Sequence, residues 1–178
     1  MKTENLQEWV GKTEERNDLL TSFPANAMAA TLNHEQLDYT ENKSLPPLWH
    51  WLYFLPIFKL SEAGYDGHAA LGDFLPPVQL PRRMWAGSRM EFFSPLQVGR
   101  EYKKTSKIKS VTAKSGSSGD LVFVTVSHEV SNGPAVFINE EHDIVYREKA
   151  TNSAVATKLV EAPKDFDFSI DINPDPVL

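Results

Sequence analysis

The second half of the chain alternates between apolar and polar residues with the period of two that β-strands show. The clearest run covers residues 121–130, and the valines of one face are Val122, Val124, Val126 and Val130. Similar runs cover 102–112 and 135–146, and a shorter one covers 88–94. The turn-forming sequences SGSSG and Asn-Gly-Pro separate the last three long runs. The pattern therefore predicts four or five antiparallel strands joined by hairpins.

The N-terminal part of the chain has helical spacing instead. Leu6, Trp9 and Val10 lie at i, i+3 and i+4 in a polar segment, which predicts a helix over residues 3–20. An alanine-rich stretch at 24–32, with a proline in its first turn, predicts a short buried helix. Helices on one face of an antiparallel sheet give an α+β fold class.

The densest aromatic stretch reads LWHWLYFLPIF and covers residues 48–58. Its apolar residues occupy odd and even positions alike, which predicts a strand that is buried on both faces. Pro56 either ends this strand or places it at the edge of a sheet. His50 lies between Trp49 and Trp51. Two interpretations stay open for this histidine: a half-buried ring satisfied by a backbone carbonyl, or a polar group lining an aromatic pocket.

Residues 66–87 contain too much proline and glycine for a helix or a central strand, yet too many large apolar residues for a solvated linker. We therefore expect a long loop. It places two guanidinium groups beside an indole, which favours a binding loop, although a loop that only covers a sheet edge fits the composition equally well. The residues at its end are Arg82, Arg83, Met84, Trp85 and Gly87.

Six of the 18 basic residues lie between Arg100 and Lys114. A solvated strand face explains such a run, with lysines that discourage pairing at a sheet edge. The alternative is an anion site for a phosphate-bearing ligand.

The composition is that of an ordinary globular protein: 178 residues, 41% apolar and 24% charged, enough for one domain. A net charge of −6 argues against a nucleic-acid-binding protein. The absence of cysteine excludes disulfides and thiolate-ligated metal sites. The sequence shows neither the pattern of a signal peptide nor an apolar run of about 18 residues, so we expect a cytoplasmic protein that does not enter the membrane.

The sequence has no phosphate-binding loop, no zinc-like spacing of ligands and no nucleophile elbow. Asp66-Gly67-His68 brings a carboxylate and an imidazole together in a loop, although most such triplets are turns. His142 and Asp143 are adjacent in a strand and project to opposite faces, so they form no local acid–base pair. For His128, on the valine face, we favour a structural, hydrogen-bonded histidine. The catalytic residues therefore stay unassigned, with three candidates: His50, Asp66 and His68.

Three segments together resemble a known family: PPLWHWLYFLP at 46–56, DGHAALGDFLPPVQLPRRMWAG at 66–87, and the two strand-like runs within 121–147. They are similar to the N-terminal half of the mesaconyl-C4-CoA and itaconyl-CoA hydratases, which are relatives of the MaoC-like dehydratases. The resemblance covers about residues 4–150. Asp73 and Ser88 depart from it, because the family pattern has a glycine at each of these positions.

The resemblance implies a hot-dog fold, in which an antiparallel sheet wraps around a helix, and the reversible hydration of an enoyl-CoA thioester. It implies no cofactor, since coenzyme A is part of the substrate. In the family the catalytic acid–base residues lie in a second hot-dog repeat, so this chain would be the substrate-binding half and would pair with a second hot-dog domain or with another copy of itself. The residues implied to bind substrate are Trp49, His50, Trp51, Arg82, Arg83, Met84, Trp85 and Gly87.

The expected organisation is a hot-dog domain over residues 1–150, followed at 151–178 by an acidic linker that leads into a second repeat. Within that linker, 165–171 alternates and is a possible strand. Two other functions fit the same fold: an acyl-CoA thioesterase, and a subunit that binds acyl-CoA without converting it.

Overall fold

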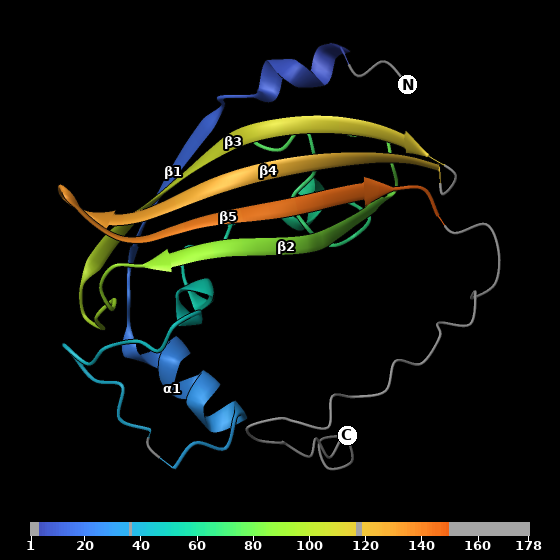
Figure 1. The fold of residues 1–178 in the computed structure, drawn as a ribbon. Helices are drawn as coiled ribbons and strands as arrows, with labels where there is room; N and C mark the ends of the chain where they lie inside the picture. The colour runs from blue at the N-terminus through green and yellow to red at the C-terminus, as the bar shows by residue number, and fades with distance from the viewer. Residues whose placement is uncertain (1–3, 36, 117–118, 150–178) are drawn as a thin grey trace, which may run out of the picture.

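The computed structural model describes residues 4–35, 37–116 and 119–149, which form a five-stranded antiparallel sheet and one α-helix (Figure 1). In spatial order the strands are β1 (Thr13–Leu19), β3 (Glu101–Gly116), β4 (Gly119–Asn132), β5 (Ala135–Arg147) and β2 (Arg82–Phe92). Three short 3₁₀ segments, η1 (Glu4–Trp9), η2 (Trp49–Leu52) and η3 (Leu60–Glu62), lie in the connections. The long central strands β3, β4 and β5 follow one another through hairpins, as their alternation predicts.

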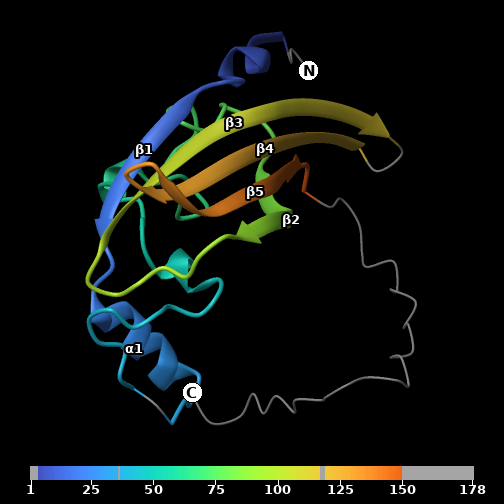
Figure 2. The ribbon, with the colours of Figure 1, turned by 60° about the vertical axis from the view of Figure 1, so that its left-hand side comes forward.

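The sheet is curved, and helix α1 (Ser22–Thr31) lies on its concave side (Figure 2). The predicted helix at 24–32 is thereby confirmed. Its small residues Ala25 and Ala29 are completely buried, which lets the helix approach its neighbours closely. The α+β class and the hot-dog architecture, a curved antiparallel sheet around a helix, are confirmed.

Apolar side chains on the concave face gather in two separate clusters. The first lies near α1 and contains Tyr102 of β3, Val130 of β4 and Ile138 of β5. The second lies at the opposite end of the central strands, where η1 and residues 78–80 cover it. The strand residues of this second cluster are Ile108, Val111, Val122, Val124, Val126 and Tyr146. The predicted valine face of β4 is therefore the core face.

Two predicted elements are wrong. Residues 3–20 are not one helix, because only the short η1 precedes the edge strand β1. Residues 48–58 are not a strand: the chain makes the 3₁₀ turn η2 and then runs on irregularly. Leu48 begins that turn with a φ of 73°, a left-handed conformation that no strand residue adopts.

The predicted loop at 66–87 ends earlier than expected, because β2 already begins at Arg82. Residues 82–87 thus lie on an edge strand, and a bulge between Trp85 and Gly87 interrupts its pairing with β5. The lysine-rich run forms β3, which lies between β1 and β4, so its lysines do not protect an edge as we expected. The predicted linker at 151–178, including the possible strand at 165–171, lies outside the described residues.

Candidate functional site

A row of polar side chains crosses the concave face between the two apolar clusters. The strand register aligns these side chains: Ser106 of β3 pairs with His128 of β4, and His128 pairs with Glu140 of β5. On the outer side of β3, Arg16 of β1 pairs with Lys104. We call this row the polar belt, and its members are Glu14, Arg16, Lys104, Ser106, His128, Glu140 and His142.

Glu140 is the most engaged residue of the polar belt. Only 4% of its side chain is exposed, yet its carboxylate accepts hydrogen bonds from three side chains. Trp51 donates from its indole nitrogen at 3.0 Å, and His50 contacts the other oxygen through Nε2 at 3.1 Å. The third contact comes from Nε2 of His142, two residues along the same strand. A carboxylate with this many donors is an acceptor held in one orientation.

Two hydrogen bonds fix the segment that carries His50 and Trp51 to the N-terminal part of the chain. The hydroxyl of Tyr53 donates to the carbonyl of Thr21 at 2.6 Å, and the backbone N–H of Phe54 donates to Asp18 at 2.7 Å. These bonds join η2 to the end of β1 and the start of α1. They hold the two donors of η2 against β5, although ninety residues separate His50 from Glu140 in sequence.

Burial alone would raise the pKa of Glu140, but the hydrogen bonds from His142, His50 and Trp51 outweigh that effect and hold the pKa well below its ordinary value. Glu140 therefore stays ionised. The environment of His128 favours the neutral form instead. Burial, together with the nearby His142 and Lys104, lowers the pKa of His128 to about 4. His128 is then neutral at pH 7, and its Nδ1 lies 2.9 Å from the hydroxyl of Ser106.

A cavity of about 250 Å³ lies beside His50. Apart from His50 and Ser94 its lining is apolar, and it includes Phe92 and Phe93 at the end of β2 together with Ile138 of the first cluster. The ring of His50 is 4% exposed, and its Nδ1 has no hydrogen-bond partner among the described residues. Of the two interpretations of His50, a ring satisfied by a backbone carbonyl is wrong, because the hydrogen-bond partner of this ring is the carboxylate of Glu140.

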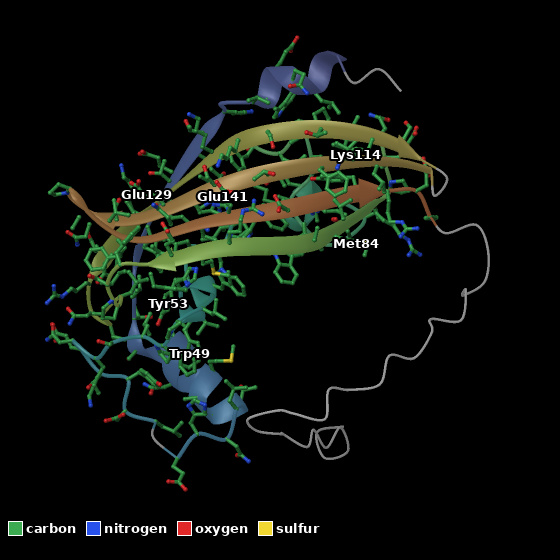
Figure 3. All side chains as sticks on the ribbon, viewed as in Figure 1. Trp49, Tyr53, Met84, Lys114, Glu129 and Glu141 are labelled. Atoms are coloured by element: carbon green, nitrogen blue, oxygen red, sulfur yellow. The ribbon has the colours of Figure 1, made fainter. Side chains whose placement is uncertain are left out.

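The predicted substrate-binding residues fall into two separate places. Trp49 packs against the first cluster near α1, whereas Met84 lies at the far end of β2 (Figure 3). Only His50 and Trp51 belong to the polar-belt region. Exposed side chains of β2 include Trp85, which is 64% exposed and donates to Ser88 at 3.0 Å.

The paired arginines have different surroundings. Arg83 binds Asp66 through Nε at 3.1 Å and through a terminal nitrogen at 2.8 Å, and a cavity of about 320 Å³ lies beside this pair. Arg82 is exposed, in register with Arg147 of β5. The side chain of His68, the third catalytic candidate, is 71% exposed, and its ring contacts Asp66. Asp66 and His68 are thus adjacent, as predicted, but they are separate from Glu140, because Asp66 binds Arg83, whose register partner on β5 is Tyr146.

Glu140, His142 and His128 are polar-belt residues that the sequence did not lead us to propose as site residues, whereas Lys104 belongs to the basic run for which an anion site stayed open. The sequence does contain a signal for this cluster. His128 lies on the valine face of its strand, and Glu140 and His142 share one face of the next strand. Asp143 lies on the opposite face, as predicted, and binds Arg89 there at 2.7 Å. Among residues 4–35, 37–116 and 119–149, no group of His, Asp and Glu is arranged to hold a metal ion, and no helix is long and apolar enough to cross a membrane.

Comparison with known proteins gives two kinds of match. The family model for hydroxyacyl-thioester dehydratase type 2 matches residues 48–178. Mesaconyl-C(4)-CoA hydratase of Chloroflexus aurantiacus is 39% identical over 178 residues, which is all of this chain and 64% of that protein. The chain thus spans less than two thirds of the relative's length.

Among solved structures, the ChsH1-ChsH2 complex from Mycobacterium tuberculosis aligns with a TM-score of 0.59 at 11% identity, covering 84% of this chain and 91% of that one. This likeness shows a shared fold. The unliganded R-hydratase PhaJ1 from Pseudomonas aeruginosa aligns with a TM-score of 0.46 at 13% identity, covering 85% and 92% of the two chains.

Proposed function

Because this chain belongs to the hydroxyacyl-thioester dehydratase type 2 family, we propose that it is the substrate-binding half of an enzyme that hydrates an enoyl-CoA or dehydrates a 3-hydroxyacyl-CoA. The observation that carries the proposal is the 39% identity to mesaconyl-C(4)-CoA hydratase along the whole chain. Coenzyme A would enter only as part of the substrate. The acyl group would be short and branched or dicarboxylic, as in mesaconyl-CoA or itaconyl-CoA.

Water addition to an enoyl thioester needs a group that takes the proton from water and a group that returns a proton to the α-carbon. Glu140 is a poor candidate for either task, because it is buried and its oxygens are occupied by three donors. Asp66 is likewise engaged by Arg83. We therefore assign the acid–base pair to a second hot-dog repeat and the binding of the acyl group to the concave side of this chain.

Pairing with that second domain would use β2. The outer backbone groups of both edge strands have no partner among the described residues, but β1 carries four charged residues among seven, which discourages pairing. Strand β2 instead presents large exposed apolar side chains, and Phe93 follows directly after it. The exposed apolar residues at this edge are Met84, Trp85, Phe92 and Phe93.

The test supplies mesaconyl-CoA and crotonyl-CoA to the 178-residue chain, alone and mixed with a polypeptide that carries the rest of the Chloroflexus aurantiacus hydratase. Loss of the enoyl absorbance is expected only in the mixture. Hydration at an enzyme-like rate by the chain alone would contradict the assignment of catalysis to a second repeat. Binding of neither thioester by the chain would contradict the substrate-binding role.

The same samples separate hydration from thioester hydrolysis. A thiol reagent detects free coenzyme A without background from this chain, because the chain contains no cysteine. We expect no thiol release beyond the rate without protein. Release of coenzyme A that matches substrate loss would make the protein a thioesterase, and thioester binding without conversion in the mixture would make it a binding subunit.

A further inference from the structure

The cavity beside His50 is mostly apolar, and it adjoins a buried ring nitrogen that has no partner among the described residues. Its volume is about 250 Å³. Whole small molecules occupy pockets of about 300 Å³ or more, so this space suits one part of a ligand, such as a short acyl group. None of its lining residues in the described part of the chain is a lysine or an arginine, so no cation there offsets the desolvation of an anion.

The ring of His50 lies between Glu140 and this cavity. Its Nε2 is directed to the carboxylate of Glu140 at 3.1 Å, and Glu140 is not among the residues that line the cavity. The atoms opposite Nε2 in an imidazole ring are Cγ and Nδ1, so Nδ1 is the nitrogen on the side of the cavity. Phe92, in register with Ile138, meets the same ring edge-on with 6.0 Å between the ring centres.

The bond to Glu140 determines which hydrogen-bonding role is left for Nδ1. Glu140 stays ionised and its oxygens only accept, so the hydrogen of a neutral His50 ring is on Nε2. Nδ1 then carries a lone pair in a side chain that is only 4% exposed. A buried acceptor without a donor costs free energy, and a donor on a ligand removes this cost.

A water molecule satisfies this nitrogen poorly. Buried waters typically make about three hydrogen bonds. The side chains that line the cavity offer two polar groups, His50 and Ser94, and Ser94 is exposed. A ligand with an apolar body and one hydroxyl fits this lining better, because it donates to Nδ1 while its carbon atoms pack against Phe92 and Ile138.

The cavity also reaches the edge that we propose for pairing with a second domain. Phe92 and Phe93 line it, and they are 43% and 54% exposed at the end of β2. A second domain on this edge would lie next to the cavity, so an acyl group held there would be within reach of its acid–base pair.

We propose that the cavity binds the acyl part of a 3-hydroxyacyl thioester and that the 3-hydroxyl donates a hydrogen bond to Nδ1 of His50. This inference deepens the proposed function and rests on it for the thioester part of the ligand. His50 then distinguishes the hydroxylated acyl group from one without the hydroxyl. Any free carboxylate of the acyl group would lie outside the cavity.

The first test compares 3-hydroxybutyryl-CoA with butyryl-CoA, whose acyl groups share a carbon skeleton and differ in the 3-hydroxyl. Calorimetric titration of the 178-residue chain should show the hydroxylated thioester bound about fivefold more tightly, as one recovered hydrogen bond implies. His50→Gln keeps an N–H₂ donor toward Glu140 but has no acceptor at the place of Nδ1, so it should reduce the preference to less than about twofold. Circular dichroism checks that the variant is folded.

His68→Gln is the matched control, because it makes the same substitution at a histidine that is 71% exposed and does not line this cavity. Its preference should equal that of the unaltered chain. Equal affinity of the unaltered chain for the two thioesters would overturn the proposal. So would a preference that survives His50→Gln but disappears in Ser94→Ala.

A second measurement needs no variant. Nitrogen NMR of the unaltered chain, labelled in its histidine rings, should show Nδ1 of His50 without a hydrogen. Addition of 3-hydroxybutyryl-CoA should shift this resonance, whereas butyryl-CoA should leave it nearly unchanged. A hydrogen on Nδ1 in the free chain, or equal shifts with the two thioesters, would contradict the assigned hydrogen bond.

Butan-2-ol and butan-2-one separate this inference from the proposed function, because they share a carbon skeleton and only the alcohol donates a hydrogen bond. If neither thioester binds but the alcohol alone shifts Nδ1 of His50, the cavity site stands and the acyl-CoA function fails. If both thioesters bind equally well and Nδ1 does not respond, the function stands and the hydroxyl site fails. If neither the thioesters nor the alcohol binds, both fail.

Discussion

Glu140 is the residue on which the polar belt depends most, because a buried carboxylate is stable only while its donors remain. Glu140→Gln removes the charge and turns an amide N–H₂ toward groups that also donate, so at least one donor loses its acceptor. We expect the free energy of unfolding to fall by about 3 kcal/mol. Urea denaturation followed by fluorescence measures the change.

The adjacent Glu141→Gln is the control for this prediction. Glu141 lies on the opposite, solvent-facing side of β5 and pairs with Arg89 at 2.9 Å and with Lys109, surface contacts whose loss costs about 1 kcal/mol or less. Equal losses in the two variants would mean that the Glu140 network contributes no more than a surface ion pair.

His128 makes stability depend on pH in a defined direction. Its pKa is about 4 in the folded protein and near its ordinary value of 6.5 in the unfolded chain. Between these values the unfolded state binds more protons, so stability falls as the pH is lowered. From pH 7 to pH 5 this histidine accounts for a loss of about 2 kcal/mol.

His128→Leu should therefore flatten the curve of unfolding free energy against pH over that range. His68→Gln removes an exposed histidine outside the polar belt, and the unfolding free energy of this variant should depend on pH as steeply as that of the unaltered chain. A His128→Leu curve as steep as that of the unaltered chain would show that another group titrates there.

The contacts of the polar belt join distant parts of the chain, and a single sequence does not reveal them. The bond between His50 and Glu140 spans ninety residues and that between Trp51 and Glu140 spans 89, although the third partner of Glu140, His142, is its near neighbour in sequence. What the alternation does reveal is the face: polar residues at 128, 140 and 142 fall on the face that valines identify as the core. Polar groups on a core face need partners, and this is the property from which the site was predictable.

At the scale of elements, helix α1 depends on its small residues. Ala25 is completely buried among Leu20, Tyr53 and Tyr102 of the first cluster, so a larger side chain has no space. Ala25→Leu should lower the free energy of unfolding by about 1–3 kcal/mol through overpacking. Thermal unfolding followed by circular dichroism measures this effect.

Ala27→Leu is the matched control, since Ala27 lies on the exposed side of the same helix. The change there should stay within about 0.5 kcal/mol. If both variants lost the same stability, helix packing would not be the cause.

The elements that sequence reasoning missed are those whose core-side residues are not apolar. Strand β1 directs Glu14, Arg16 and Asp18 toward the concave face, in register with Ser106, Lys104 and Tyr102, so it shows no apolar alternation. The strands β3, β4 and β5 were predictable because their core-facing positions carry valine, isoleucine and tyrosine. The aromatic run at 48–58 was misleading, because its density of apolar residues reflects contact with α1 and β5 rather than a place in the sheet.

At the scale of the whole molecule, the edge of β2 is the surface that we propose for association. Met84 and Trp85 are large and exposed on a strand whose outer backbone groups have no partner in the part of the chain that the structure describes. We expect the chain on its own to dimerise through this edge, and Met84→Lys with Trp85→Lys to shift it toward the monomer. Sedimentation velocity distinguishes the two states.

Asn17→Lys places one lysine on β1, at the other edge of the sheet, and should leave the dimer intact. A monomeric unaltered chain, or a dimer equally sensitive to the β1 substitution, would contradict association through β2.

The polar belt also divides the interior, because it separates two apolar clusters along the same three strands. Each cluster can then act as its own cooperative unit, with the belt as the boundary at which partial opening stops. In native-state hydrogen exchange, amides of residues 122–126 and of residues 130–138 should become exchangeable at different denaturant concentrations. A single common opening free energy for both groups would mean that the strands transmit cooperativity across the belt.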